Sequence, residues 1–560
     1  MRLRSFAFVA ALFALALPFV GCDSDDPDPI DPPDGDVVAP EVTGTATAFF
    51  VDGTATDQGG GLTLALSADA SNIALATEGT GNTVTFRAAK VNLATAATGF
   101  VIATDAAGNQ DSLGVALAAV NFAQADLEYA SLIEPLLDVR DVFDGAPTAH
   151  DALFASDAGA FLIPFDADGS ILFRVIDAGA SVDGLNVGSL AADEVAYLRR
   201  WVDAGAPDDS GAIPYEGATE FALVCNQLDG RVSVIDIRAG RVIRTLDFTD
   251  LGLSATIKPH DIVAEPDGSA WYVALIDANS VLKFSTDLND LGNGVDAFIA
   301  QTTPGVGAFT TPGMLALDPD GMLYAGRSFA DQSGSQSIAM IDRATMSLDE
   351  IAVPYTRPHA IEQVGDYVLS SSLSENVVVS IDVSDPLQAE VVDQISLGGG
   401  MKSLVMFDVS PDGQQAVLTS QLSQEIFLLD ISDPTDLGLD GIIGVGEQPW
   451  HPTYSPDGTT LYVPNRLSNS VSVIDVATQA ITATITHPAL SQPHGSAITA
   501  DGRFLVVSSR NTMGGYTPAF PYAGSQANPG TVVVIDTQTD TVVHVIEIGA
   551  FASGVEVVNL

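Results

Sequence analysis

The sequence predicts a mainly β protein whose C-terminal part, residues 219–560, is a seven-bladed β-propeller. A tight-turn signal, most often Pro-Asp-Gly, recurs six times, and successive turn aspartates lie 44 to 53 residues apart. Short apolar strands such as "VSVID" (residues 471–475) follow these turns after a variable gap. Periods of about 40 to 50 residues with several short strands are typical of propeller blades, which bury one another's sheet faces.

The two ends of this part predict how the ring closes. Residues 221–246 read as the second to fourth strands of a blade that lacks a first strand. Residues 552–560 read as a first strand that lacks a second. Together they form a seventh blade, which closes the ring and removes its free sheet edges.

The repeats resemble a known family. The Tyr-Val pair and the phrase "SNSVSVID" in residues 461–475 resemble the YVTN-repeat family of bacterial envelope propellers, and the resemblance recurs in most blades. It implies a seven-bladed fold but little about chemistry, because propellers carry many unrelated activities.

The N-terminus has the pattern of a secretory signal. Two early arginines precede an apolar run, and a small residue stands just before Cys22. Residues 1–21 resemble a lipoprotein signal, which implies that Cys22 is acylated and anchors the chain to a membrane. The alternative is an ordinary cleaved signal with an accidental cysteine. Residues 22–37, rich in aspartate and proline, are expected to form an extended acidic linker.

Two small domains are expected before the propeller. Residues 38–119 alternate apolar and polar side chains, which predicts a β-sandwich. Their phrase "ATDAAGN" resembles a turn of bacterial Ig-like modules, which usually act as spacers. Residues 124–212 have helical spacing, and "AADEVAYLRRWVDAGAP" resembles the end of small cytochrome c-like domains.

The cytochrome c-like domain is expected to carry no haem. The family attaches its haem through a Cys-x-x-Cys-His motif, but the corresponding region reads "LDVRDVFDGAPTAH" and has no cysteine. His150 alone cannot hold a c-type haem. The alternative is an unrelated helical linker domain.

The charge balance excludes one class of partner. The chain has 72 acidic and 21 basic residues, for a formal net charge of −51. Such a charge suits a halophilic, acid-coated protein. Binding to nucleic acid is not expected, because no basic stripe is available to neutralise phosphates.

We expect a monomer in the cell envelope, periplasmic or surface-exposed.

Histidines occupy equivalent positions in three blades. His260, His359 and His494 each stand seven residues before the turn aspartate of their own repeat. Trp450 takes this position in a fourth repeat, and His451 lies beside it. Because inner strands line the central channel of a propeller, these side chains are expected to ring one mouth of it.

Basic residues are expected at the same mouth. Strand direction alternates within a blade, so the connections between second and third strands lie on this face. They carry Arg327, Arg466 and Arg510, and Lys402 stands close to the start of another inner strand. The long, aromatic-rich connection of residues 510–530 is expected to form a flap there. On so acidic a protein, these cations predict a local anion site.

Three roles for the histidines remain open. They hydrogen-bond neighbouring blades, or they bind a small anion or an anionic sugar. Alternatively His260, His359 and His494 bind a metal, since neutral imidazoles suit copper, zinc or iron. No cofactor is expected, apart from such a metal at the channel mouth.

The predicted function is therefore non-catalytic binding or scaffolding, with a small anion, an envelope protein or a glycan as the partner. The rival is an enzyme on the same face, either metal-dependent or a hydrolase that resembles the lactonases, whose family also uses a seven-bladed propeller. An acid–base pair within the face would favour the enzyme, and an open flat face would favour the binding protein.

Overall fold

The structure is a computed structural model that describes residues 38–292, 294–302, 309–328, 334–522 and 524–560. The predicted signal (residues 1–21), Cys22 and the acidic linker (residues 22–37) lie outside the described residues. The chain divides into two compact units, and each is described by itself. Among the described helices, none is long and apolar enough to cross a membrane.

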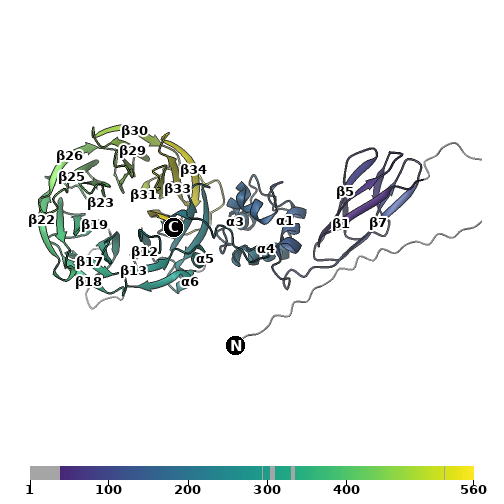
Figure 1. Ribbon diagram of the computed structural model, residues 1–560, viewed down its shortest axis with the longest axis horizontal. Helices are drawn as coiled ribbons and strands as arrows, with labels where there is room; N and C mark the ends of the chain where they lie inside the picture. The colour runs from purple at the N-terminus through teal and green to yellow at the C-terminus, as the bar shows by residue number, and fades with distance from the viewer. Residues whose placement is uncertain (1–37, 293, 303–308, 329–333, 523) are drawn as a thin grey trace, which may run out of the picture. The chain divides into compact units, whose positions relative to one another are not determined.

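The first unit consists of two β-sheets (Figure 1). One sheet has the order β1 (Glu41–Ala46), β2 (Phe50–Thr56), β5 (Thr83–Lys90), β4 (Ile73–Glu78), and the other the order β3 (Thr63–Leu66), β6 (Ala97–Thr104), β7 (Gln110–Leu117). Burial alternates along β5, with Val84 and Phe86 inside, as expected for strands that cover one core. The resemblance to Ig-like modules stays a prediction.

The second unit begins with a helical segment. Its helices are η1 (Tyr129–Ile133), α1 (Glu134–Arg140), α2 (His150–Ala155), η2 (Asp157–Phe161), α3 (Ile171–Ala178) and α4 (Ala192–Asp203). Aromatic rings fill its core, with Tyr129 tilted against Trp201 and with Phe154 beside His150. The Nε2 atom of His150 lies 2.8 Å from the Ala206 carbonyl oxygen. The cytochrome c-like, haemless interpretation stays a prediction.

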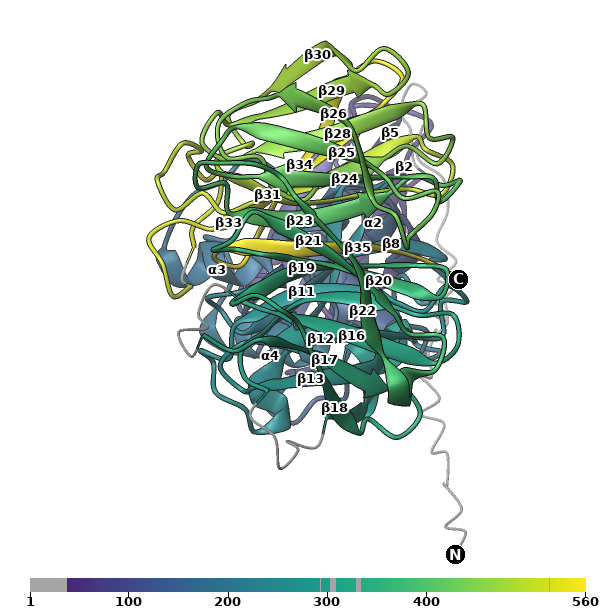
Figure 2. The same cartoon turned by 90° about the vertical axis from the view of Figure 1, so that its left-hand side faces the viewer.

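Seven four-stranded antiparallel sheets form a ring in the second unit. In Figure 1 the outer strands β18, β22, β26 and β30 lie on the rim and the inner strands β19, β23 and β31 nearer the centre, and Figure 2 shows the blades from the side. From the first blade to the seventh, the strands are β11 (Pro259–Ala264), β12 (Ala270–Leu275), β13 (Ser280–Ser285), β14 (Phe298–Gln301); β15 (Pro312–Leu317), β16 (Met322–Arg327), β17 (Ser337–Asp342), β18 (Leu348–Ala352); β19 (Pro358–Val364), β20 (Tyr367–Ser372), β21 (Val377–Asp382), β22 (Glu390–Ser396); β23 (Leu404–Val409), β24 (Gln415–Ser420), β25 (Glu425–Asp430), β26 (Gly438–Gly444); β27 (Thr453–Tyr454), β28 (Thr460–Asn465), β29 (Ser470–Asp475), β30 (Ala480–Thr486); β31 (Pro493–Ile498), β32 (Phe504–Ser509), β33 (Gly530–Asp536), β34 (Thr541–Ile548); and β35 (Ala552–Asn559), β8 (Glu220–Asn226), β9 (Arg231–Asp236), β10 (Arg241–Asp247). Short helices η3 (Phe248–Leu251), α5 (Leu288–Leu291), α6 (Gly294–Ala297) and η4 (Pro386–Gln388) stand in the connections.

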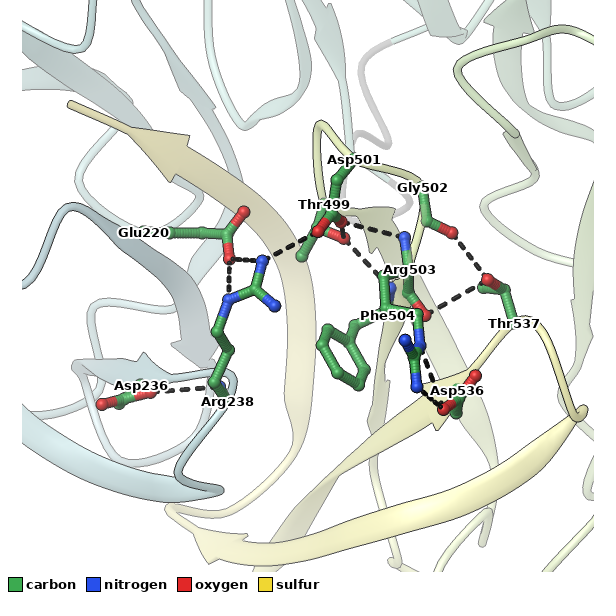
Figure 3. A network of polar contacts seen from close by, with 10 residues as sticks. All are labelled: Glu220, Asp236, Arg238, Thr499, Asp501, Gly502, Arg503, Phe504, Asp536 and Thr537. Atoms are coloured by element: carbon green, nitrogen blue, oxygen red, sulfur yellow. Dashed lines mark hydrogen bonds and ion pairs between the residues drawn. The ribbon is translucent and has the colours of Figure 1, made fainter.

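The last blade closes the ring as the sequence predicts. β35 from the C-terminus pairs with β8, from Ala552 opposite Asn226 to Asn559 opposite Glu220. Figure 3 shows a polar contact across the seam, where Arg238 of the seventh blade binds Asp501 on the turn of the sixth, with N and O atoms 2.9 Å apart. The same guanidinium binds Glu220 on β8.

The recurring turn closes the inner hairpin of a blade. Asp412 accepts hydrogen bonds from the Ser410 hydroxyl and the Gln414 amide, and Gly413 has φ +68°. Aspartate is suited to this bond and glycine to this backbone, which explains the recurrence of Pro-Asp-Gly.

Apolar residues of adjacent blades pack face to face. Val224 of the seventh blade shares a buried cluster with Val506 and Val534 of the sixth. Every residue of β12 is buried, so such strands read as continuous apolar runs. At about 25 cal/mol per Å² of apolar surface buried, these contacts are the main stabilising term of the ring.

Candidate functional site

Each inner strand is preceded by a residue with a left-handed backbone. These residues have φ between +54° and +60°. None of them is glycine, and a left-handed backbone costs a non-glycine residue roughly 1–2 kcal/mol. Strain of this kind gathers at functional sites and persists only where packing enforces it. We call them the opening residues; they are Lys258, Thr311, Arg357, Ser403, Gln448, Gln492 and Phe551.

His260, His359 and His494 each stand two residues after an opening residue, and the structure brings them together. The ring centroids of His260 and His494 are 5.8 Å apart, and those of His260 and His359 are 6.4 Å apart. Trp450 lies 4.2 Å and His451 4.8 Å from His494, centroid to centroid. All five side chains are buried. Equivalent positions in different blades thus meet around the axis.

Burial keeps these imidazoles neutral. It lowers the pKa of His359 to about 4 and that of His451 to about 3, and it holds the pKa values of His260 and His494 well below their usual range. The Nδ1 atom of His260 is 3.1 Å from Gln227 Oε1, to which it donates. Its Nε2 atom is buried without a hydrogen-bond partner in the described part of the chain. This atom is therefore left as an acceptor.

The metal alternative receives no geometric support. Among the described residues, no group of three or more His, Cys, Asp or Glu side chains is arranged to hold a metal ion.

A pocket of about 460 Å³ opens at the histidine end of the channel. Six of its lining residues share one position, the first after the second strand of a blade, and the others are opening residues or stand two residues later. All of the described lining residues are neutral or basic: Gln227, Ile276, Ser328, Gln421, Arg466 and Arg510, with Lys258, Gln448, Phe551, His260 and Trp450.

Two arginines give this pocket its charge. The guanidinium carbons of Arg466 and Arg510 lie 5.3 Å and 4.9 Å from the centre of the Trp450 ring, and that of Arg510 also lies 4.1 Å from the Phe551 ring. Burial lowers the pKa of both arginines, most of all that of Arg510. Lys258 is different, because its ammonium is paired with Asp277 at 2.9 Å.

Five predicted members do not line the pocket: the buried His359, His451 and His494, and two cations, Arg327 and Lys402. Arg327 lies one residue before the lining position taken by Ser328, and its guanidinium binds Ser337 and Glu350 inside its own blade. Lys402 likewise stands one residue before the opening residue of its blade and lies 3.4 Å from Glu425. Successive side chains of an extended chain point in opposite directions, so an offset of one residue turns each cation away.

The aromatic flap is also placed differently from the prediction. No described residue from 512 to 529 lines the mouth pocket. Instead, Phe520 packs edge-on against Phe161 of the helical segment, and the Pro521 carbonyl accepts a hydrogen bond from Arg174 of α3. The loop leaves the mouth at Arg510 and docks on the helices.

Sequence reasoning missed the amides of the pocket and a set of carboxyl groups farther along the inner strands. Glu362, Asp408 and Glu556 each stand five residues after an opening residue, and Asp261 stands three after one. Burial raises their pKa values to about 8, 6, 8 and 7, respectively. The opening residues from which these offsets are counted are recognised by their backbone angles, so the sequence alone marks neither set.

Three of these carboxyl groups, those of Asp261, Asp408 and Glu556, connect neighbouring blades. Asp261 of the first blade accepts a hydrogen bond from the Leu315 amide of the second, 2.9 Å away. Asp408 of the fourth accepts one from the Tyr454 amide of the fifth, 2.6 Å away. They therefore hold inner strands together around the channel.

Comparison with known proteins supports the propeller. Residues 299–546 match the model of the family described as "Lactonase, 7-bladed beta-propeller". No curated protein matches the chain.

Solved structures of bacterial proteins are similar at low identity. A functionally unknown protein from Desulfotomaculum acetoxidans is 15% identical, with 60% of this chain and 99% of that one covered and a TM-score of 0.48. A protein from Lactobacillus plantarum is 16% identical, with 61% and 100% covered and a TM-score of 0.48. A "putative 6-phosphogluconolactonase" from Bacteroides fragilis is 15% identical, with 62% and 100% covered and a TM-score of 0.47. The family match makes the C-terminal region a seven-bladed propeller domain similar to those of the lactonases.

Proposed function

We propose that the propeller binds a small anionic ligand of sugar size at its channel mouth. The observation that carries this is the pair Arg466 and Arg510, held over Trp450 in a pocket lined by neutral and basic residues. The Nε atoms of both arginines are buried and make no hydrogen bond within the described residues. In a chain of net charge −51, such cations favour a carboxylate or a phosphate as the ligand.

The neutral groups of the pocket suit hydroxyls on the same ligand. His260 Nε2 and Gln448 Oε1 are buried acceptors without a partner in the described part of the chain. A hydroxyl can donate to such an acceptor. The pocket volume of about 460 Å³ lies in the range of small-molecule sites, about 300–1,000 Å³. A hydroxylated acid therefore fits better than a bare anion.

The test is titration calorimetry on the full chain with D-gluconate and inorganic phosphate as probes and sorbitol as the uncharged counterpart. We expect gluconate to bind more tightly than phosphate and sorbitol to bind not at all. Arg510→Gln and Arg466→Gln should each weaken binding about tenfold or more, because each removes a charged donor. Arg503→Gln is the matched control, since Arg503 pairs with Asp536 outside the mouth. Absence of binding by both anions would contradict the proposal.

A second candidate is a lactonase-like hydrolase, favoured by the family match over residues 299–546. In this reaction His260 Nε2 takes a proton from water as the water attacks the lactone carbonyl. Arg466 or Arg510 stabilises the oxyanion. The ring C–O bond then breaks, and protonated His260 gives its proton to the leaving alkoxide, which yields a hydroxy acid. Hydrolysis of D-glucono-δ-lactone, followed by acid release, tests it: His260→Gln should abolish the rate above background. If the parent does not exceed the uncatalysed rate, the binding function stands alone.

The setting of this activity is also a proposal. The signal-like residues 1–21, Cys22 and the acidic linker support a lipid-anchored protein of the cell envelope. The Ig-like and haemless cytochrome c-like domains then serve as spacers between the membrane and the propeller.

A further inference from the structure

A second, larger hollow lies where the helical segment meets the propeller. Its volume is about 1060 Å³. One wall is formed by η2 and α3, and the other by β8 to β10 of the seventh blade, β34 of the sixth and the loop around Tyr522. Both walls belong to the same compact unit.

Hydrogen bonds between the two walls preform this hollow. Arg174 Nε on α3 donates to the Pro521 carbonyl at 2.7 Å. Arg241 Nη1 on β10 donates to the carbonyls of Phe154 and Ser156 in the helical segment, at 3.1 Å and 2.9 Å. A pocket whose walls are already fixed pays little ordering entropy when it binds a ligand.

Residues that line this hollow also carry buried polar atoms without partners. Among the described residues, buried atoms that make no hydrogen bond include Asn226 Oδ1, Arg241 Nε, Arg174 Nη2, Asp166 Oδ2 and Glu547 Oε2, and all five residues line the hollow. Asn226 is 1% exposed and Arg241 is 8% exposed. Arg174 Nη2 and Glu547 Oε2 are 3.8 Å apart, beyond hydrogen-bonding distance. Buried polar atoms of this kind require a partner from water or from a ligand.

The chemistry of the lining selects a class of ligand. Two of these atoms are donors and three are acceptors, a mixture that hydroxyl groups satisfy because each can donate and accept. The lining also has more carboxylates than arginines, which disfavours an anion. Phe161 and Phe520 add apolar surface that suits the C–H faces of a sugar ring.

We propose that this hollow binds a neutral oligosaccharide of two or three sugar units. The hydroxyls of the sugar pair with the polar side chains of the lining, and its ring faces pack on Phe161 and Phe520. The hollow shares no lining residue with the mouth pocket, and the proposal stands whether or not the mouth binds an anion.

The experiment is titration calorimetry of the full chain with cellotriose, maltotriose and chitotriose, and with spermidine as a cationic probe. At least one trisaccharide should bind, and spermidine should not compete with it. Phe520→Ala should raise the Kd about tenfold, the loss of one aromatic contact. Ile171→Trp fills the hollow from α3 without removing a hydrogen-bonding group and should abolish binding.

Phe100→Ala is the control, since Phe100 is an exposed aromatic residue in the first unit. Thermal melts establish that each variant is folded. Failure of all three trisaccharides to bind would overturn the proposal, as would binding of spermidine alone. If Ile171→Trp melts like the parent and still binds the sugar with the parent's affinity, the sugar lies elsewhere and the proposal is wrong.

Discussion

The rings of His260 and His494 lie 5.8 Å apart, although they belong to the first and the sixth blades. Each stands two residues after an opening residue with a left-handed backbone, Lys258 in one blade and Gln492 in the other. Because the blades are arranged in a ring, side chains at the same position of two repeats come close together near the axis. The neutral histidines and the carboxyl groups of the inner strands should each have a measurable effect on stability.

The histidines should lower the stability of the protein in acid. Burial depresses the pKa of His359 to about 4 and that of His451 to about 3, whereas the unfolded chain takes up protons near 6.5. The unfolded state therefore binds more protons between these values, so the free energy of unfolding falls as pH drops below about 6.5. For His359 alone the full loss approaches roughly 3 kcal/mol.

Replacing His359 by Leu should reduce the fall in the free energy of unfolding in acid, measured by urea unfolding between pH 7 and pH 4. His487, a half-buried histidine in the connection after β30, is the comparison: His487→Leu should change the loss of stability in acid less than His359→Leu does. An equal pH dependence in His359→Leu and the parent would contradict a buried, neutral His359.

The carboxyl groups of the inner strands should have the opposite pH dependence. Burial raises the pKa of Glu362 and Glu556 to about 8, above the value of about 4.3 in an unfolded chain. The folded state then holds more protons between these values, so stability falls as pH rises from about 4 to 8. Glu362→Gln with Glu556→Gln should remove much of this fall in melting temperature. A double variant that loses stability as steeply as the parent would show that these groups are ionised in the folded state.

Closure of the ring should depend on β35. Deleting residues 554–560 removes most of the inner strand paired with β8 and exposes sheet edges, which promote aggregation. We expect a large fall in melting temperature or an insoluble protein. Arg238→Ala removes the contacts of one half-exposed guanidinium, to Asp501 across the seam and to Glu220 on β8, and should cost far less stability than the truncation. A truncated protein that melts with the parent would refute this closure.

Acylation of Cys22 makes a prediction about location. Cys22→Ser should move the protein from the membrane fraction to the soluble envelope fraction, measured by fractionation and immunoblotting. Cys225→Ser is the control, because Cys225 is buried in the propeller and cannot be acylated in the folded protein. Equal membrane retention of Cys22→Ser and the parent would rule out the lipid anchor.

The sequence by itself determined the propeller, its blade count and its closure, because each blade is a local unit and its turns and strands recur at a readable period. It also placed the histidines, because counting from a repeated turn identifies equivalent positions.

Only the tertiary structure decided which neighbours of those positions reach the mouth. Arg466 and Arg510 line it, whereas Arg327 and Lys402 are turned away by an offset of one residue, since side chains alternate in direction along an extended chain. The pocket amides, the carboxyl groups that link the blades and the hollow between helices and propeller likewise come from separate parts of the chain. No local pattern marks them, because only folding brings those parts together.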